Sequence, residues 1–424
     1  MAFKITQCII PFMQQNKQNL LQVINGPHNK NSFGTSRNYQ NKDDHAHMSN
    51  KAGVFLKKPI SDCKSNTGHL GENLAAILYG KNDLRMEQRP IPTILPNQVL
   101  LQMEVCGICG TDVHFLEDGK LGSWSIDKPI VIGHEASGTI LECGSSVKHL
   151  KIGDKVAVEP QSSCRMCIYC KTGNYHMCPN LYFCAAPPND GNLCRYYAHD
   201  ADFCHKLPCN LDLEHGCLME PLAVGVHGCK KGHITSGDFV LIIGAGPVGL
   251  ASLLASRAYG ASTIIVVDID DFKLEKSIEM GADCAINVNG LNEHDAVQKI
   301  HDIFGEAPNK TLECCGFKEA LRIGLLATRS CGKMVLLGLG ETDVQLPIME
   351  SVYKEIDVIG AIRYANDYQN AIDMVAKGKV DPKPLITHHF KLEDAVKAYE
   401  TAAKREEKYI KIVIHANPNW QSQN

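Results

Sequence analysis

The sequence has few of the features that mark a membrane protein or a nucleic-acid-binding protein. Only 2 tryptophans occur in 424 residues, aromatic residues make up 6 %, and the formal net charge is −4. No apolar run approaches the roughly 18 residues that a membrane-spanning helix needs, and no strongly basic surface is expected from so small a charge. We therefore expect a soluble chain that binds neither membrane nor nucleic acid, and its length favours more than one domain.

Residues 1–71 differ in composition from the rest of the chain. They are rich in Asn and Gln, contain a single Arg (Arg37), and show no sustained period of helix or strand. We predict a disordered N-terminal extension. A mitochondrial transit peptide is the alternative, and a secretory signal is disfavoured because Pro11 breaks the short apolar start. Without a route to an oxidising compartment, the 19 cysteines indicate a cytoplasmic protein with reduced thiols.

The remaining chain changes its pattern twice. From Asn73, short Val- and Ile-rich runs separated by Gly and Pro predict a largely antiparallel β domain over 72–221. From about Asp238, strands alternate with helices, which predicts βαβ units on a parallel sheet over 222–363. The last segment, 364–424, returns to helix and one strand, and we expect it to pack back on the first domain. The fold class is therefore α/β with two domains.

A glycine motif follows the first strand of the predicted parallel sheet. Gly244, Gly246 and Gly249 form GAGPVG between an apolar strand and a helix, a context that predicts binding of a dinucleotide pyrophosphate at the helix N-terminus. Asp268 ends the next strand, where a carboxylate binds a ribose 2′-hydroxyl and repels a 2′-phosphate. NAD is therefore expected rather than NADP. Lys273 either weakens that preference or lies over the adenosine.

Four cysteines lie close together in the first predicted domain, at Cys164, Cys167, Cys170 and Cys178. Four thiolates on one loop can complete a tetrahedral zinc site that leaves no position for substrate. A disulfide does not suit a reducing compartment, and an iron–sulfur cluster lacks any other redox signature in the chain. We therefore predict a structural zinc site.

A second metal site is indicated by residues that are spread along the chain. Cys109 lies in GICGTDVH, His134 and Glu135 lie in GHE, and Glu220 lies in MEPLAVG. One thiol, one imidazole and carboxylates suit a catalytic zinc ion with an open fourth position. Taken singly, each residue also has an ordinary structural explanation.

Together, GHEASG, the four-cysteine loop, MEPLAVG and GAGPVG resemble the zinc-containing medium-chain dehydrogenases, and specifically the sorbitol (polyol) dehydrogenases. The likeness extends from about Asn73 to Ala416 and includes CGTDVHF and the late RYAN. It implies a GroES-like β catalytic domain followed by a Rossmann doubly wound parallel sheet. It also implies NAD-dependent oxidation of a polyol such as sorbitol or xylitol to the ketose, and a homotetramer, with a dimer as the alternative.

The resemblance implies a role for particular residues. Zinc is bound by Cys109, His134 and Glu135, and Glu220 contacts the zinc-bound water or substrate and can exchange with Glu135 as a ligand. Arg363 and Tyr364 bind polyol hydroxyls. Glu220, or Thr111 with His114, relays the proton. The residues assigned to NAD are the three motif glycines with Val248, Asp268, Lys273, Leu337, Gly338, Leu339, Ala361, Ile362 and Arg363.

Two departures from the family pattern concern the cysteine loop and Phe115. Vertebrate sorbitol dehydrogenases lack the loop, and better-known relatives have a substrate-contacting Tyr where this chain has Phe115, so the preferred polyol stays open. Two alternative functions also stay open. One is a zinc dehydrogenase for a secondary alcohol or threonine, which Glu220 argues against. The other is a non-catalytic protein that binds zinc and nucleotide.

Overall fold

The structure is a computed structural model that describes residues 71–122, 124–406 and 408–421. The predicted extension over residues 1–71 therefore lies outside the described residues, except for Gly71. No helix in the described part of the chain combines the length and the hydropathy that crossing a bilayer requires.

The first half of the described chain, together with two strands from its C-terminal end, builds a mostly antiparallel sheet of seven strands. The strand order is β12-β8-β7-β3-β20-β19, and β11 pairs with β3 beside this path. Its strands are β3 (Gln98–Gly107), β7 (Glu135–Cys143), β8 (Lys155–Val158), β11 (Tyr196–Asp200), β12 (Cys204–Lys206), β19 (Ile386–Lys391) and β20 (Lys411–His415). Val99, Leu100 and Leu101 of β3 are all buried, so both faces of the strand are covered in this stretch.

Smaller elements complete this part of the molecule. A three-stranded sheet has the order β2-β1-β6, and two ribbons pair β4 with β5 and β9 with β10. The strands are β1 (Asn73–Gly80), β2 (Asp83–Arg89), β4 (Lys120–Leu121), β5 (Trp124–Ser125), β6 (Ile130–Val131), β9 (Gln161–Ser162) and β10 (Tyr182–Phe183). The helices are α1 (Gly110–Asp118), α2 (Ile168–Lys171), α10 (Ala395–Lys404) and the 3-10 turns η1 (Tyr175–Met177), η2 (Ala201–Phe203), η3 (Lys383–Leu385) and η4 (Leu392–Asp394).

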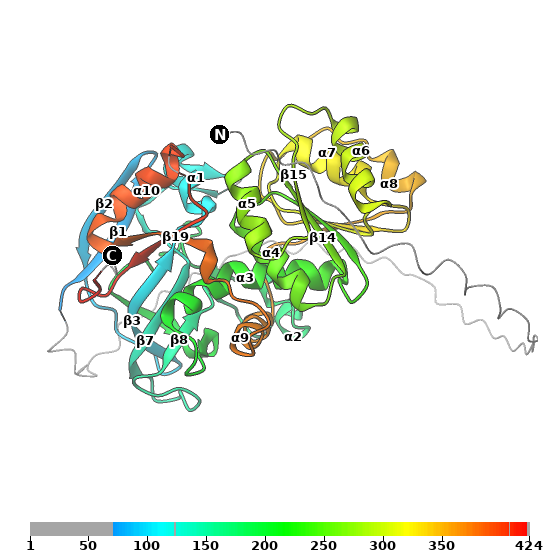
Figure 1. Ribbon diagram of the computed structural model, residues 1–424. Coiled ribbons are helices and arrows are strands. Elements are labelled where there is room, and N and C mark those ends of the chain that lie inside the picture. Colours follow the sequence, from blue (N-terminus) through cyan, green and yellow to red (C-terminus); the bar gives the residue numbers. More distant parts are fainter. Residues whose placement is uncertain (1–70, 123, 407, 422–424) are drawn as a thin grey trace, which may run out of the picture. The chain divides into compact units, whose positions relative to one another are not determined.

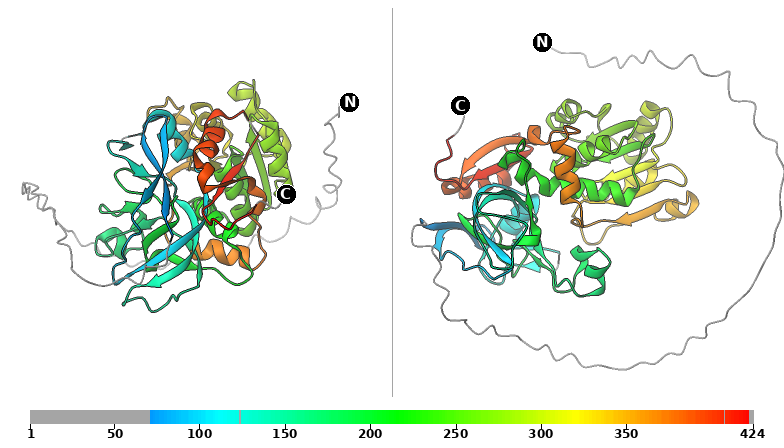
Figure 2. Two further views of the ribbon diagram at one scale, coloured as in Figure 1. Left: turned by 90° about the vertical axis from the view of Figure 1, so that its left-hand side faces the viewer. Right: turned by 90° about the horizontal axis from the view of Figure 1, so that it is seen from below.

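The C-terminal strand joins the sheet of the first half. β20 pairs antiparallel with β3 and parallel with β19, so the red strand lies beside the cyan strands in Figures 1 and 2. Its buried residues Ile412 and Ile414 belong to the same core as β1, β3 and α10. This pairing places Lys411 and His415, both buried, inside the first half of the fold.

The middle of the chain builds a six-stranded parallel sheet with the order β15-β14-β13-β16-β17-β18. Its strands are β13 (Phe239–Ile243), β14 (Thr263–Asp268), β15 (Cys284–Asn287), β16 (Lys310–Glu313), β17 (Lys333–Leu336) and β18 (Asp357–Gly360). The helices of this part are α4 (Pro247–Ala258), α5 (Asp271–Glu279), α6 (Glu293–Phe304), α7 (Lys318–Ala327) and α8 (Met349–Tyr353). In chain order the strands read 3-2-1-4-5-6, so the direction reverses between β13 and β16, where such sheets bind their ligands.

Helices cover both faces of the parallel sheet (Figure 1). Val240 and Ile242 of β13 pack in one core with Leu250 of α4, whereas Leu241 and Ile243 pack in another with residues of α6 and α7. Successive side chains of β13 thus point to opposite faces, and both faces are buried. This explains the continuous apolar run FVLII.

The helix α3 (Leu213–Gly232) contacts β7 and β8 of the first sheet and β16 and β17 of the parallel sheet. The side chain of Asp212 caps its N-terminus by accepting from the backbone N–H of His215. The helix continues through Pro221 and therefore crosses the position 221/222, where the sequence predicts a domain boundary. A further helix, α9 (Tyr368–Ala376), packs against α3.

Candidate active site

Three potential zinc ligands come together at the start of α1 and β7. Cys109 is the N-cap of α1, His134 precedes β7, and Glu135 is the first residue of β7. Their ligand atoms lie within 4.8 Å of one another. A Cβ at Gly107, the partner of Glu135 across β3 and β7, would lie 2.2 Å from a Glu135 oxygen, so glycine makes room for this carboxylate. Thiolate, imidazole and carboxylate are donors that zinc accepts in catalytic sites, and the three residues fit such a site.

A buried carboxylate orients His134. Oδ1 of Asp112 lies 3.2 Å from Nδ1 of His134, and the other Asp112 oxygen accepts from the Tyr399 hydroxyl at 3.2 Å. The negative charge of Asp112 at this distance favours the tautomer with its hydrogen on Nδ1, which leaves the Nε2 lone pair for a metal. Burial opposes charge on the ring, but Asp112 and Cys109 outweigh it and raise the pKa of His134 well above its usual value. The electrostatic field at this point therefore favours a cation.

A buried lysine binds the third ligand candidate. Nζ of Lys411 lies 2.7 Å from each oxygen of Glu135 and donates to the carbonyl of Ile108 at 3.0 Å. Both side chains are only 2 % exposed. Because an isolated buried charge is very costly, each of these groups depends on the other. Lys411 thereby holds the carboxylate of Glu135 in one position beside Cys109 and His134.

Glu220 lines the same cavity from the middle of α3. Its Oε1 accepts from the hydroxyl of Tyr364 at 2.8 Å. Burial raises the pKa of Glu220 to about 7, with His134 opposing and Glu135 reinforcing the shift. A carboxyl group with this pKa can take up and release a proton near neutral pH.

The structure places Tyr364 differently from the sequence expectation. Its side chain is fully buried and does not line the cavity, so it touches Glu220 rather than a space that a polyol could occupy. Burial and the Glu220 charge together raise the pKa of the Tyr364 hydroxyl well above its usual value, which keeps it a hydrogen-bond donor. Tyr364 therefore positions Glu220.

A cavity of about 280 Å³ joins the ligand candidates to the parallel sheet. On the side of the zinc-ligand candidates, the cavity is lined by Thr111, His114 and Phe115 from α1. Phe115 is buried, whereas the side chain of His114 is 43 % exposed. This volume suits a small molecule, and its lining mixes apolar side chains with a few polar groups.

The guanidinium of Arg363 lies in the cavity wall at a backbone φ of 55°. Its Cζ lies 4.3 Å from the centre of the Phe183 ring and 5.9 Å from that of Trp124. No carboxylate of a described residue lies within ion-pair distance of Arg363, and burial lowers the pKa of the guanidinium. The aromatic rings hold the group while its N–H donors remain available to hydroxyl groups in the cavity.

The glycine motif forms the turn between β13 and α4. Gly244 has a φ of 98°, Gly246 is the N-cap of α4, and a Cβ at Gly249 would meet the Gly244 carbonyl oxygen at 1.8 Å. Gly246 and Val248 line the cavity, and so do Cys314 and Cys315, which follow β16. These residues lie at the point where the strand order reverses, as expected for a dinucleotide site.

The other residues predicted to bind NAD divide into two groups. Five line the cavity beside Arg363, namely Leu337, Gly338, Leu339, Ala361 and Ile362. Asp268 and Lys273 do not line it. Asp268 ends β14, and its Oδ2 accepts from the backbone N–H of Ala245 at 2.6 Å. The carboxylate therefore also fixes the glycine turn, which the sequence pattern did not indicate.

The four cysteines form a compact group on one loop. Sγ atoms of Cys164, Cys167, Cys170 and Cys178 lie within 4.8 Å of one another. Backbone N–H groups of Met166 and Cys167 point at the Cys164 sulfur from 3.4 and 3.3 Å and lower the pKa of that thiol to about 6. Burial raises the pKa of Cys178 to about 11. Four sulfur donors at this spacing fit a closed tetrahedral zinc site.

Known families match both halves of this arrangement. Residues 95–209 match the alcohol dehydrogenase GroES-like domain, and residues 247–377 match the zinc-binding dehydrogenase family. Over 352 residues the chain is 44 % identical to sorbitol dehydrogenase of Rattus norvegicus, with 83 % of this chain and 98 % of that protein covered. The chain belongs to the sorbitol dehydrogenase family. The predicted fold, a GroES-like domain with a Rossmann domain, is thereby confirmed.

Solved structures of other dehydrogenases share the fold of this sorbitol dehydrogenase family member. L-idonate 5-dehydrogenase from Escherichia coli superposes with a TM-score of 0.75 at 27 % identity, covering 82 % of this chain and 99 % of that one. An alcohol dehydrogenase from Escherichia coli in complex with NADH superposes with a TM-score of 0.75 at 26 % identity, covering 82 % of this chain and 100 % of that one.

Several residues of this family member's site were not found from the sequence. Lys411 carried a signal, because a lysine inside the apolar strand KIVIH indicates a buried charge with a partner. Asp112 lies only three residues after Cys109, and a carboxylate behind a ligand histidine is common in zinc sites. Phe183 and Trp124 offered no such signal, since their position over Arg363 depends on tertiary packing.

Proposed function

We propose that this zinc-binding dehydrogenase oxidises one secondary hydroxyl of a polyol such as sorbitol or xylitol to the ketose, reversibly, and transfers the hydride to NAD⁺. The observation that carries the proposal is a single cavity that combines three zinc-ligand candidates, the carboxyl of Glu220, the guanidinium of Arg363 and the glycine turn. Glu220 and Arg363 supply the hydrogen-bonding groups that a molecule with several hydroxyls requires.

Each residue has a separate role in this proposal. Cys109, His134 and Glu135 hold zinc, which when bound supplies a Lewis acid that lowers the pKa of a hydroxyl group. Glu220 accepts the hydroxyl proton, and Tyr364 keeps its carboxyl group aimed at the cavity through the 2.8 Å hydrogen bond. Thr111 and His114, which lie on the same wall, are the alternative proton route. Arg363 binds further hydroxyls, so that only one carbon faces the cofactor.

The cofactor role rests on the glycine turn and on Asp268. The N–H groups at the start of α4 would bind the pyrophosphate of NAD⁺ beside Gly246, and the bound nicotinamide would supply the hydride acceptor. Asp268, at the end of β14, accepts from the ribose 2′-hydroxyl and repels a 2′-phosphate. Val248, Leu337, Leu339 and Ile362 form the apolar part of the same cavity. The four-cysteine loop holds a second, structural zinc ion.

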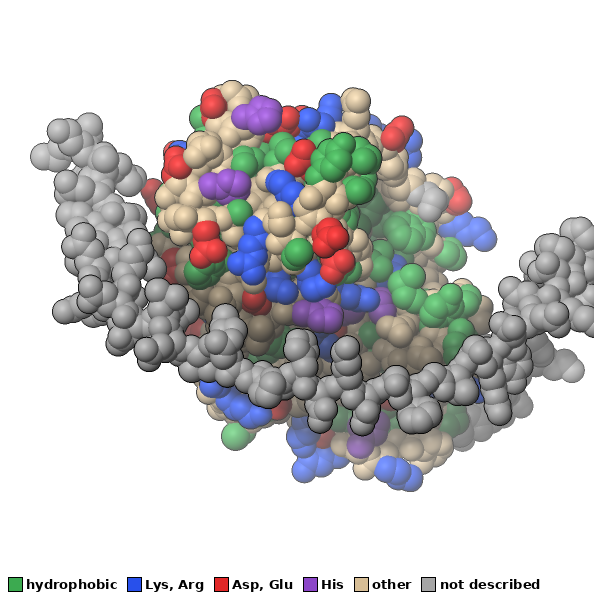
Figure 3. Space-filling view, turned by 90° about the vertical axis from the view of Figure 1, so that its right-hand side faces the viewer, with side chains coloured by type: hydrophobic (Ala, Val, Ile, Leu, Met, Phe, Trp, Pro, Cys, Tyr) green, Lys and Arg blue, Asp and Glu red, His purple; other side chains and the backbone are tan. Residues whose placement is uncertain are grey.

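The assembly and location of the enzyme belong to the same proposal. Figure 3 shows apolar side chains among charged ones on one face of the molecule. Large exposed apolar residues of α8 and the edge strand β18 include Met349, Val352, Tyr353 and Val358. An unpaired, apolar sheet edge supports self-association, and we propose a homotetramer, which native mass spectrometry measures directly. We propose a cytoplasmic location, because the four thiols of the cysteine loop fit metal ligands, which need a reducing compartment.

One assay separates this function from its alternatives. NADH formation is followed at neutral pH with sorbitol, xylitol, threonine and 2-propanol, with and without a chelator. We expect kcat/KM to be at least about tenfold higher for a polyol, a difference of about 1.4 kcal/mol in transition-state binding. Equal or higher values for threonine or 2-propanol would overturn the polyol assignment. No turnover of any substrate would favour a non-catalytic binding protein.

Paired cysteine variants test the zinc ligands. Cys109→Ser should lose almost all turnover and keep NADH binding, measured by quenching of protein fluorescence. The exposed Cys209, which does not line the cavity, provides the matched control, and Cys209→Ser should retain full activity. Retained activity in Cys109→Ser would exclude a metal held by this thiol.

A further inference from the structure

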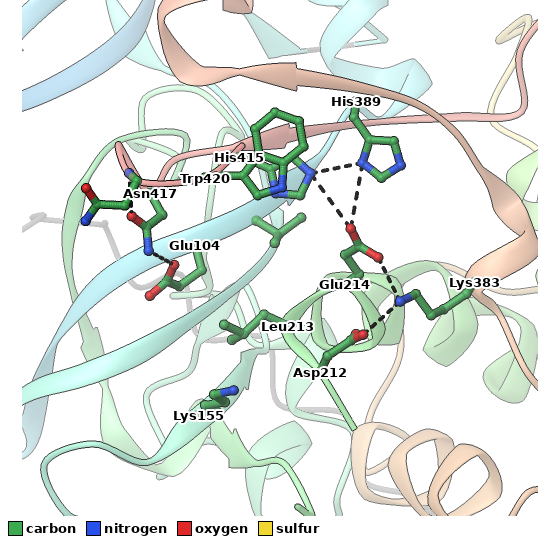
Figure 4. A pocket seen from close by; sticks show the side chains of 12 residues that line it. Glu104, Lys155, Asp212, Leu213, Glu214, Lys383, His389, His415, Asn417 and Trp420 are labelled. Carbon is green, nitrogen blue, oxygen red and sulfur yellow. Dashed lines mark hydrogen bonds and ion pairs between the residues drawn. The ribbon is translucent and has the colours of Figure 1, made fainter. Parts of the chain in front are cut away.

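A third group of potential metal ligands lies outside both sites described above. Glu214, in the first turn of α3, His389 on β19 and His415 at the end of β20 have ligand atoms within 4.8 Å of one another. They line a separate cavity of about 540 Å³, which shares no lining residue with the catalytic cavity among the described residues. Figure 4 shows the three side chains pointing toward one another.

The distances between the donor atoms match a metal coordination shell. Nδ1 of His389 lies 3.0 Å from Nε2 of His415, and Oε1 of Glu214 lies 3.7 Å from the first nitrogen and 3.9 Å from the second. Ligands about 2.0 to 2.1 Å from a tetrahedral zinc ion lie about 3.3 to 3.4 Å from one another. Shifts of a few tenths of an ångström would therefore bring all three into bonding distance.

We propose that Glu214, His389 and His415 bind a third divalent transition-metal ion, with Zn²⁺ as the ion that the donor set fits best. Two imidazoles and one carboxylate are the ligands of a zinc site that keeps its fourth position open. The two histidine nitrogens face each other across 3.0 Å, so at most one hydrogen lies between them. A cation in place of that hydrogen would satisfy both nitrogens and the carboxylate oxygen.

Neighbouring side chains hold two of the ligands in this orientation. Lys383 binds the other oxygen of Glu214 at 2.9 Å and Asp212 at 2.7 Å, which leaves Oε1 of Glu214 turned toward the histidines. The indole of Trp420 stacks on the His415 ring with centroids 3.9 Å apart and planes 9° apart. Supporting contacts of this kind fix the orientation of metal ligands.

The exposure of the ligands indicates how the ion would enter and what it would leave open. His415 is buried and Glu214 half-buried, whereas the side chain of His389 is 38 % exposed. His389 thus lies at the solvent side of the group and lines the cavity. The fourth position would hold water or an oxygen or nitrogen donor from a small molecule. The ion would also tie α3 to β19 and β20.

Zinc content measured on the full chain tests this site without relying on activity. After equilibration with Zn²⁺ and removal of loosely bound metal, inductively coupled plasma mass spectrometry should find three zinc ions per chain. His389→Ala should carry two, because it lacks one of the three ligands. His388→Ala is the matched control on the same strand, since the His388 ring packs against Tyr409 instead, and it should carry three.

A calorimetric titration adds a measurement of affinity. Zn²⁺ titrated into the two-zinc form of the enzyme should bind with one further equivalent, and Glu214→Gln should weaken this step by at least about tenfold. Both His389 and Glu214 lie at or near the surface, so these variants should fold. A wild-type chain that takes up no third equivalent would overturn the proposal. A third equivalent that His389→Ala retains would overturn it too, whatever the substrate of the catalytic site.

Discussion

At the scale of single residues, buried charged side chains that are not zinc ligands orient the residues that are. Asp112 is 0 % exposed, and it contacts His134 on one oxygen and Tyr399 on the other. An imidazole binds metal only through a nitrogen that carries no hydrogen. With a carboxylate oxygen 3.2 Å from Nδ1 of His134, Asp112 favours the tautomer that carries its hydrogen on Nδ1 and leaves Nε2 free for a metal.

This role predicts the effect of Asp112→Asn. The asparagine keeps the size of the side chain, but its amide N–H can face Nδ1 and favour the opposite tautomer of His134. We expect zinc affinity at the catalytic site to fall by roughly 10- to 100-fold. The measurement is the chelator concentration that removes half of the activity, together with the zinc concentration that restores it. Asp127→Asn, a change at an exposed carboxylate that does not line the cavity, should leave both values unchanged. An Asp112→Asn enzyme with the chelator sensitivity of the wild type would contradict this role.

The sequence predicts the residues that carry the chemistry better than those that orient them. Cys109, His134 and Glu135 lie in motifs that resemble a known family, and the structure brings them together. Lys411 is 276 positions from Glu135 in the chain, so no local pattern could connect the two. Tyr364 belongs to a recognisable motif, but its direction depends on α3 packing beneath it, and it faces Glu220 rather than the cavity.

At the scale of elements, the turn between β13 and α4 shows two different reasons for glycine. Gly249 faces the chain itself, because a Cβ there would lie 1.8 Å from the carbonyl oxygen of Gly244. Gly246 has a φ of −74° and no protein atom within 4 Å of an added Cβ. Gly249 is therefore required for packing, whereas Gly246 leaves a space beside the helix N-terminus that a bound pyrophosphate can enter.

A pair of alanine variants separates these two reasons. Gly249→Ala should destabilise the protein by about 1–3 kcal/mol in urea unfolding, because the helix must move away from the turn. Gly246→Ala should change the free energy of unfolding by less than about 0.5 kcal/mol. It should nevertheless weaken NADH binding by roughly tenfold or more, or about 1.4 kcal/mol, in a fluorescence titration. An unchanged NADH affinity in Gly246→Ala would exclude the pyrophosphate from this turn.

Element type was more predictable than element pairing. The alternation of strands and helices from about Asp238 predicts the parallel sheet, because strands separated by helices form βαβ units. That β20 would pair with both β3 and β19 could not be read from YIKIVIHA, since any apolar strand has the same local pattern. Likewise, α3 joins both halves because its buried residues share one core with residues of both sheets, such as Ala157 and Val240, and its composition does not reveal this.

At the scale of the whole molecule, the four-cysteine loop contacts the loop that carries Arg363. The hydroxyl of Tyr175 donates to Glu159 at 2.8 Å and accepts from the backbone N–H of Asn366 at 2.8 Å. The side chain of Asn366 donates to the carbonyl of Gly173 at 3.0 Å. These contacts join segments about 190 residues apart in the chain. A zinc ion that orders the cysteine loop therefore also supports the position of Arg363 in the cavity wall.

This coupling predicts the behaviour of Tyr175→Phe, which deletes only the shared hydroxyl. Losing both hydrogen bonds leaves the Glu159 carboxylate and the Asn366 N–H with one partner fewer, at a cost of about 1–3 kcal/mol. Part of this cost should fall on the loop of Arg363, so KM for the polyol should rise by roughly tenfold while KM for NAD⁺ stays unchanged.

Tyr169→Phe is the matched control from the same loop, because the Tyr169 side chain is exposed and its hydroxyl has no hydrogen-bond partner among the described residues. Equal polyol KM values for the two variants would show that the cysteine loop supports folding alone. A rise confined to Tyr175→Phe would show that a zinc site without substrate contact still sets substrate affinity.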